Sequence, residues 1–201
     1  MVHIGDTKFY EEVKHHLQNC DVIMEEGVNS TSVKLLTASY EYLEKNPKLK
    51  LALQEQLNPE EFSGKIIYPD VSGENFEKKL TKIPLRYRLT IFTLAPLYGQ
   101  YMRWFGSREK ILKRAGVEML ESRNNILSED KTTEQFLDIL LTWRDKALMM
   151  ALDEQIKLPA NAGKKIAVVY GAEHMRAVLK FLLLKRKFKV IDSEWLTVIK
   201  A

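Results

Sequence analysis

The stretch "KKIAVVYGAEHMRAVLKFLLLKR", residues 164–186, decides the fold class. It begins with a continuous apolar run, which is typical of a strand that is buried on both faces of a parallel sheet. Gly171 interrupts the run, and the residues after it have the apolar spacing of a helix. The segment "KFKVIDSEW", residues 187–195, is predicted to be the next strand. These residues therefore predict a strand–helix–strand unit.

The beginning of the chain repeats this plan. "MVHI", residues 1–4, predicts a short strand, "KFYEEVKHHLQN", residues 8–19, a helix, and "CDVIMEEGV", residues 20–28, a second strand. Two similar units at the two ends predict an α/β fold, in which a largely parallel sheet is built from two βαβ-type halves and helices pack against it.

The middle of the chain is predicted to be mostly helical and to form one domain with the two ends. We expect helices at 32–45 and 47–57, a short strand and a helix within 64–80, an apolar and basic helical insertion at 85–125, and one or two helices at 128–157. The single domain would span residues 1–201.

The composition excludes several classes of protein. The net charge of +4 comes from 31 basic and 27 acidic residues spread along the chain, so we expect no nucleic-acid partner. The single cysteine, Cys20, excludes an internal disulfide and fits a reducing compartment. The first residues lack the pattern of a signal peptide, so we expect a cytoplasmic protein. The longest uncharged run, 89–102, is shorter than the roughly 20 residues that cross a bilayer.

Two histidines and a glutamate are candidate site residues. His174 lies in the first turn of a predicted helix, where the helix dipole favours a neutral imidazole that can accept a metal or a proton. His3 and Glu26 belong to the corresponding unit at the beginning of the chain, and the carboxyl ends of parallel strands share one edge of a sheet. Glu25 should face the other side of the sheet. Such a set suits a divalent metal, although a single histidine near a turn is more often structural.

Arg144 is a charge within the apolar helical segment "LLTWRDKALMMAL", residues 140–152. It either pairs with the neighbouring Asp145 or reaches into the site to hold a carboxylate or a substrate oxygen. Asp70, at the end of "KIIYPD", either adds a further acid to the site or belongs to a turn. Motifs for dinucleotide or nucleotide phosphates are absent, so we expect no organic cofactor.

Four segments, in this order along the chain, resemble the TraB/PrgY/Tiki superfamily. They are "VHIGDTKFYEEVKHHLQNCDVIMEEGV" (2–28), "LALQEQLNPEEFSGKIIYPDV" (51–71), "RDKALMMAL" (144–152) and "VVYGAEHMRAVLKFL" (168–182). The resemblance implies an α/β fold similar to the erythromycin-esterase and ChaN-like group. For the Tiki branch it implies a divalent-metal-dependent protease with two G-x-x-H motifs and a glutamate.

The resemblance also assigns residues to these motifs. Gly171 and His174 match the second G-x-x-H motif, His3 the histidine of the first, Glu26 the glutamate, and Arg144 the arginine of the family. The glycine of the first motif would precede the first residue, so that motif is incomplete. Many members are described as regulatory proteins without demonstrated catalysis. The resemblance therefore leaves a metal-dependent hydrolase and a non-catalytic regulatory protein open.

The expected ligands follow from these two functions. In the hydrolase, His3, His174 and Glu26 would hold a manganese, cobalt or zinc ion, Glu26 would activate its water, and Arg144 would stabilise negative charge. In either function, a peptide or a small molecule would bind.

Segment 85–105 combines aromatic residues and arginines, as in peripheral membrane elements. A buried core helix and a contact between copies of the chain are the other interpretations of this segment.

Overall fold

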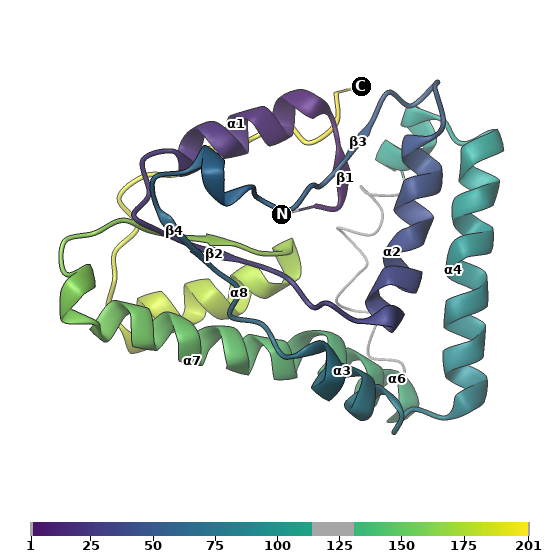
Figure 1. The fold of residues 1–201 in the computed structure, drawn as a ribbon. Coiled ribbons are helices and arrows are strands. Elements are labelled where there is room, and N and C mark those ends of the chain that lie inside the picture. Colours follow the sequence, from purple (N-terminus) through teal and green to yellow (C-terminus); the bar gives the residue numbers. More distant parts are fainter. Residues whose placement is uncertain (1, 114–130, 201) are drawn as a thin grey trace.

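The centre of the protein is a small parallel sheet, which we describe from a computed structural model covering residues 2–113 and 131–200 (Figure 1). Its strands, in the order β4-β2-β5, are β4 (Lys65–Ile67), β2 (Val22–Glu25) and β5 (Ile166–Val169). All four residues of the central strand β2 are buried. This burial on both faces explains why β2 and β5 have nearly continuous apolar sequences.

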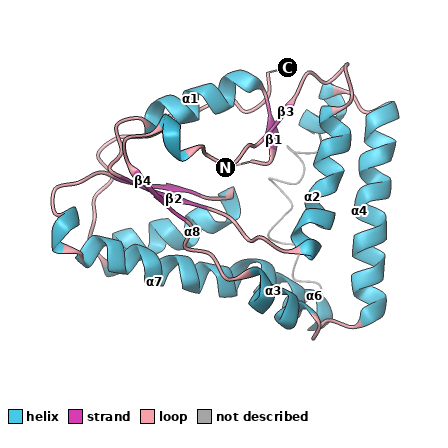
Figure 2. Cartoon of the chain, viewed as in Figure 1, coloured by secondary structure: helices cyan, strands magenta, loops and turns pink. Residues whose placement is uncertain are grey.

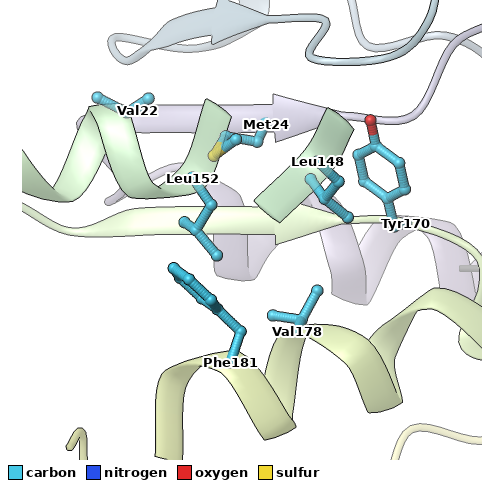
Figure 3. Close-up of a cluster of buried hydrophobic side chains, with 7 residues drawn as sticks. All are labelled: Val22, Met24, Leu148, Leu152, Tyr170, Val178 and Phe181. Carbon is cyan, nitrogen blue, oxygen red and sulfur yellow. The ribbon is translucent and has the colours of Figure 1, made fainter. Parts of the chain in front are cut away.

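Helices cover both faces of this sheet. Figure 1 shows α1 (Thr7–Leu17) on one face, and α7 (Trp143–Lys157) and α8 (Ala172–Lys180) on the other. The core on the second face, drawn in Figure 3, consists of Val22, Met24, Leu148, Leu152, Tyr170, Val178 and Phe181. On the first face, Leu17 of α1 packs with the buried side chains of Ile23 and Val169. The predicted α/β character is confirmed, although helices make up most of the described chain (Figure 2).

A second group of helices lies beside the sheet. It consists of α2 (Thr31–Glu44), α3 (Gly73–Leu80), α4 (Leu85–Phe105) and α6 (Lys131–Leu137), and a π-helical turn (Asp138–Thr142) joins α6 to α7. α2 and α4 pack closely, because a Cβ on Gly99 would lie only 2.7 Å from Cα of Ser39. No helix within 2–113 and 131–200 is long and apolar enough to cross a membrane.

The predicted helix at 47–57 is wrong. This segment contains a turn and the short strand β3 (Ala52–Leu53), which pairs antiparallel with β1 (Ile4–Gly5) in a separate two-stranded sheet. The leucines at 49, 51 and 53 alternate with a period of two, which suits an extended chain better than a helix. The first predicted strand therefore does not join the parallel sheet, and the beginning of the chain is no βαβ unit within it.

The strand predicted at 187–195 is also wrong, because no described strand covers it. After α8 the helix continues as a π-helical turn (Phe181–Lys185), and Lys187 then has a φ of 60°. The following segment runs toward α1 rather than along the sheet (Figure 1), and the N–H of Asp6 donates to the carbonyl of Val198 at 2.8 Å. Residues 114–125 of the predicted helical insertion lie outside the described residues.

Two 3-10 turns and the two π-helical turns named above are the short helical segments of the described chain. The 3-10 turns cover Pro59–Glu61 and Pro159–Asn161, and each begins with a proline, whose fixed φ and missing N–H suit the first position of a helical turn. The π-helical turn before α7 ends at Thr142, two residues before Arg144. Such turns are frequent at functional sites, because they change the direction of the side chains that follow.

Candidate functional site

Glu26 and His174 lie at the same edge of the parallel sheet, because Glu26 follows β2 and His174 begins the helix after β5. Glu26 Oε2 accepts a hydrogen bond from the N–H of Gly171 at 2.6 Å. A Cβ at Gly171 would lie 3.2 Å from this oxygen, so glycine permits the close approach. The parallel order of the strands thus brings together two residues that are 148 positions apart in the sequence.

Arg144 links two carboxylates beside this edge. Its Nη2 lies 2.6 Å from Glu26 Oε1 and 2.5 Å from Asp70 Oδ2, and its Nε lies 3.0 Å from Asp70 Oδ1. The three side chains are 12%, 15% and 1% exposed for Arg144, Glu26 and Asp70. Arg144 is thus salt-bridged, but its partners are Glu26 and Asp70 rather than Asp145. Arg144 instead holds Asp70 in a bidentate ion pair, which is the strong geometry of this interaction.

The ion pair keeps Glu26 charged. Burial alone would raise the pKa of Glu26, but the charge of Arg144 and the hydrogen bonds from Gly171 and Arg144 together lower it. Glu25, the preceding residue, behaves in the opposite way. Its side chain accepts from the N–H of Leu57 at 3.0 Å, and burial raises its pKa. The two neighbouring glutamates thus point to different partners, as the alternation of side chains in a strand requires.

His174 forms a second polar pair, with Asp145. Its Nδ1 lies 2.7 Å from Asp145 Oδ1, its Nε2 lies 3.6 Å from Glu26 Oε1, and its side chain is only 4% exposed. When Nδ1 carries the ring proton and donates a hydrogen bond to Asp145, Nε2 has a lone pair that can accept a proton or bind a metal. Sequence reasoning missed this role of Asp145. Consecutive residues of a helix project about 100° apart, so Arg144 and Asp145 contact different partners.

The charges of Glu26 and Arg144 act on the imidazole of His3. Its ring centroid is 5.2 Å from that of Tyr40, and one side of His3 is open to solvent. The surrounding protein lowers the pKa of His3 by desolvation, Glu26 acts against this shift, and Arg144 adds to it. The structure places Glu26, Asp70, Arg144, Gly171 and His174 in one cluster of direct polar contacts, whereas the described ring contact of His3 is with Tyr40.

Tyr170 is a site residue that the sequence analysis missed. It is 1% exposed, and its hydroxyl has no hydrogen-bond partner among the described residues. Figure 3 shows this hydroxyl near the carboxyl end of β2, and the ring meets that of His174 edge-on at 5.6 Å. Burial raises the pKa of Tyr170, so the hydroxyl keeps its proton. In the sequence Tyr170 extends an apolar strand, and only its position before Gly171 could have indicated a role at the site.

The arrangement of these residues was compared with the requirements of a metal ion. Within residues 2–113 and 131–200, no group of three or more His, Cys, Asp or Glu is arranged to hold a metal. Glu26 Oε1 instead binds Arg144, and Oε2 binds the N–H of Gly171. The set His3, Glu26 and His174 therefore does not fit a metal as it is arranged here, and metal binding stays a prediction.

A large cavity lies elsewhere in the molecule. It has a volume of about 790 Å³ and is formed by α1 and residues 194–200. None of the residues of the cluster around Arg144 lines it. Of the predicted site residues, only His3 is exposed.

Comparisons with known proteins give no match. No model of a protein family matches the chain. No curated protein matches it, and no solved structure does. The function must therefore be argued from the chemistry of the cluster.

Proposed function

We propose that the chain is a hydrolase in which His174 and Arg144 are the catalytic residues and Glu26 positions Arg144. One observation carries the proposal, namely the buried pair in which His174 Nδ1 lies 2.7 Å from Asp145. A carboxylate in this position orients the imidazole and fixes its tautomer, so that Nε2 can remove a proton from water. The resemblance to the TraB/PrgY/Tiki superfamily supports the same reaction class, with peptides as the substrates.

The steps of the reaction would be assigned to residues of the cluster as follows. His174 Nε2 takes a proton from water as the water oxygen bonds to the substrate carbonyl carbon, and the carbonyl oxygen becomes negatively charged. Arg144 has five N–H donors, of which four make hydrogen bonds to Glu26, Asp70 and Leu140. The remaining N–H stabilises the new negative charge. His174 then returns its proton to the leaving amine as the carbon–nitrogen bond breaks.

The divalent ion that the resemblance implies is a separate proposal. His174 Nε2 is the donor best suited to it, because Asp145 holds the other ring nitrogen. Glu26 could contribute an oxygen only if its bond to Arg144 lengthened, and His3 would have to complete the set. Manganese, cobalt and zinc are the ions to be tested, and no step of the proposed reaction depends on them.

The ion pairs support a second candidate, a non-catalytic protein that binds a peptide or a signal molecule. Glu26 and Asp70 already neutralise Arg144, and these side chains are largely buried. Such a network is also what a purely structural cluster would need, because a buried charge must be paired.

The experiment that separates the two candidates is a hydrolysis screen with a matched pair of variants. Purified wild type, His174→Ala and His15→Ala would be incubated with a peptide library, with and without manganese, cobalt and zinc. His15 is an exposed histidine of α1 and serves as the control. We expect His174→Ala to reduce hydrolysis by at least about 100-fold and His15→Ala to leave it unchanged.

Elemental mass spectrometry of the same three proteins, after dialysis against the three ions, tests the metal. Close to one ion per wild-type chain, lost only in His174→Ala, would establish the metal site. Absence of hydrolysis by the wild type under all conditions would contradict the enzyme and leave the binding protein.

A further inference from the structure

The outer face of α4 is apolar and exposed. Leu94, Leu97, Tyr101, Trp104 and Phe105 recur at spacings of three and four residues, so they share one face of the helix. Their exposed fractions run from 51% to 64%. A contiguous apolar surface of this kind marks an interaction site in soluble proteins. The interpretation of segment 85–105 as a buried core helix is therefore wrong for this face.

The inner face of the same helix holds it firmly to the protein. Gly99 and Met102 are buried, and Gly99 lies directly against Ser39 of α2. At the end of the helix, the buried Asn46 side chain donates to the carbonyls of Met102 at 3.1 Å and Gly106 at 3.3 Å. Figure 1 shows α4 at the margin of the molecule, with α2 between it and the sheet. The outer face is thus presented on a fixed element.

The charges along α4 have one sign. The helix contains three arginines and no acidic residue in 21 positions. Arg86 and Arg103 are exposed, and the exposed Lys110 and Lys113 follow the helix. The guanidinium of Arg103 lies over the ring of Trp104 at 5.7 Å from its centroid. Tryptophan and tyrosine flanked by basic residues are typical of the boundary between lipid headgroups and acyl chains.

We propose that the outer face of α4 binds the surface of an anionic lipid bilayer. Its apolar side chains would enter the headgroup region, while Arg86 and Arg103 would contact lipid phosphates. A second copy of the chain suits this face less well, because two copies of α4 would bring arginines together without acidic partners on either helix. α4 would lie on the bilayer, since no described helix could cross it. This proposal is independent of the hydrolase.

Vesicle flotation tests the proposal with the full chain. We expect the protein to float with vesicles of phosphatidylcholine that contain about one third phosphatidylglycerol. Binding to pure phosphatidylcholine should be weaker by on the order of tenfold or more, because the basic residues would lose their attraction to an anionic surface. High salt should weaken binding to the anionic vesicles. Equal flotation with both lipids, or none, would overturn the proposal.

Two double variants identify the surface. Trp104→Asp/Phe105→Asp should abolish flotation, whereas the control Ile191→Asp/Trp195→Asp should retain it. Ile191 and Trp195 are 97% and 92% exposed and lie outside α4, so neither variant removes a buried side chain. Equal loss in both variants would place binding elsewhere. If the wild type does not float but forms dimers that Trp104→Asp/Phe105→Asp separates, the face is a contact between copies and the proposal is wrong.

Discussion

Two arginines of this protein, Arg144 in the cluster and Arg103 on α4, show how the surroundings decide what a charge does. Arg144 is 12% exposed and held by Glu26 and Asp70, whereas Arg103 is exposed beside the ring of Trp104. Removing a charge from water is costly, so Arg144 needs fixed partners and a fixed geometry. Arg103 remains hydrated and can adapt to a partner. The buried Arg144 therefore belongs to a site of fixed geometry, whereas the exposed Arg103 belongs to a surface that can adapt to a partner.

The largest difference between the two arginines is expected when each charge is removed in turn. Arg144→Met should lower the free energy of unfolding by about 3–5 kcal/mol, because Glu26 and Asp70 would remain buried without a cation. Arg103→Met should change it by no more than about 0.5 kcal/mol, as is usual for exposed positions. Urea unfolding followed by circular dichroism measures both. Similar effects of the two substitutions would show that the cluster is not the buried network described here.

Lowering the pH should reduce the contribution of the cluster to stability, because Glu26 becomes protonated. Its pKa is lowered in the folded protein, so its contribution to stability is complete above the ordinary glutamate pKa of about 4.3 and is lost as the pH falls through the folded pKa. We expect Glu26→Gln to be less stable than the wild type near neutral pH, and the difference to shrink below about pH 4.

Urea unfolding at several pH values measures this difference, with Glu11→Gln on the exposed side of α1 as the control. A difference between wild type and Glu26→Gln that does not depend on pH would contradict the role of the Arg144 ion pair.

A small effect on stability is expected at Tyr170. Its hydroxyl is buried without a described partner, so Tyr170→Phe removes a desolvated polar group and breaks no hydrogen bond. The free energy of unfolding should stay the same or rise by up to about 1 kcal/mol. Hydrolysis should fall if this hydroxyl donates to the substrate oxygen. A large loss of stability in thermal unfolding would reveal a structural partner of the hydroxyl instead.

Part of the candidate site could be predicted from the sequence. Glu26 directly follows β2 and His174 lies in the first turn of the helix after β5, and the edge formed by the carboxyl ends of parallel strands follows from strand direction alone. The partners within the site could not be predicted. Whether Asp145 reaches His174 depends on the rotation of α7 against the sheet, and that rotation is set by the packing of residues such as Leu148 against side chains of β2 and α8 that are distant in the sequence.

The sequence by itself determined the elements with strong local patterns, among them β2, α2, β5 and α8, because apolar periodicity and capping act over a few residues. Only the tertiary structure decided that β1 pairs with β3, that residues 187–195 join no strand, and that the outer face of α4 is exposed. Strand partners and exposure depend on which distant segments occupy the neighbouring space. Local patterns contain no information on those segments, so packing of the whole chain decides them.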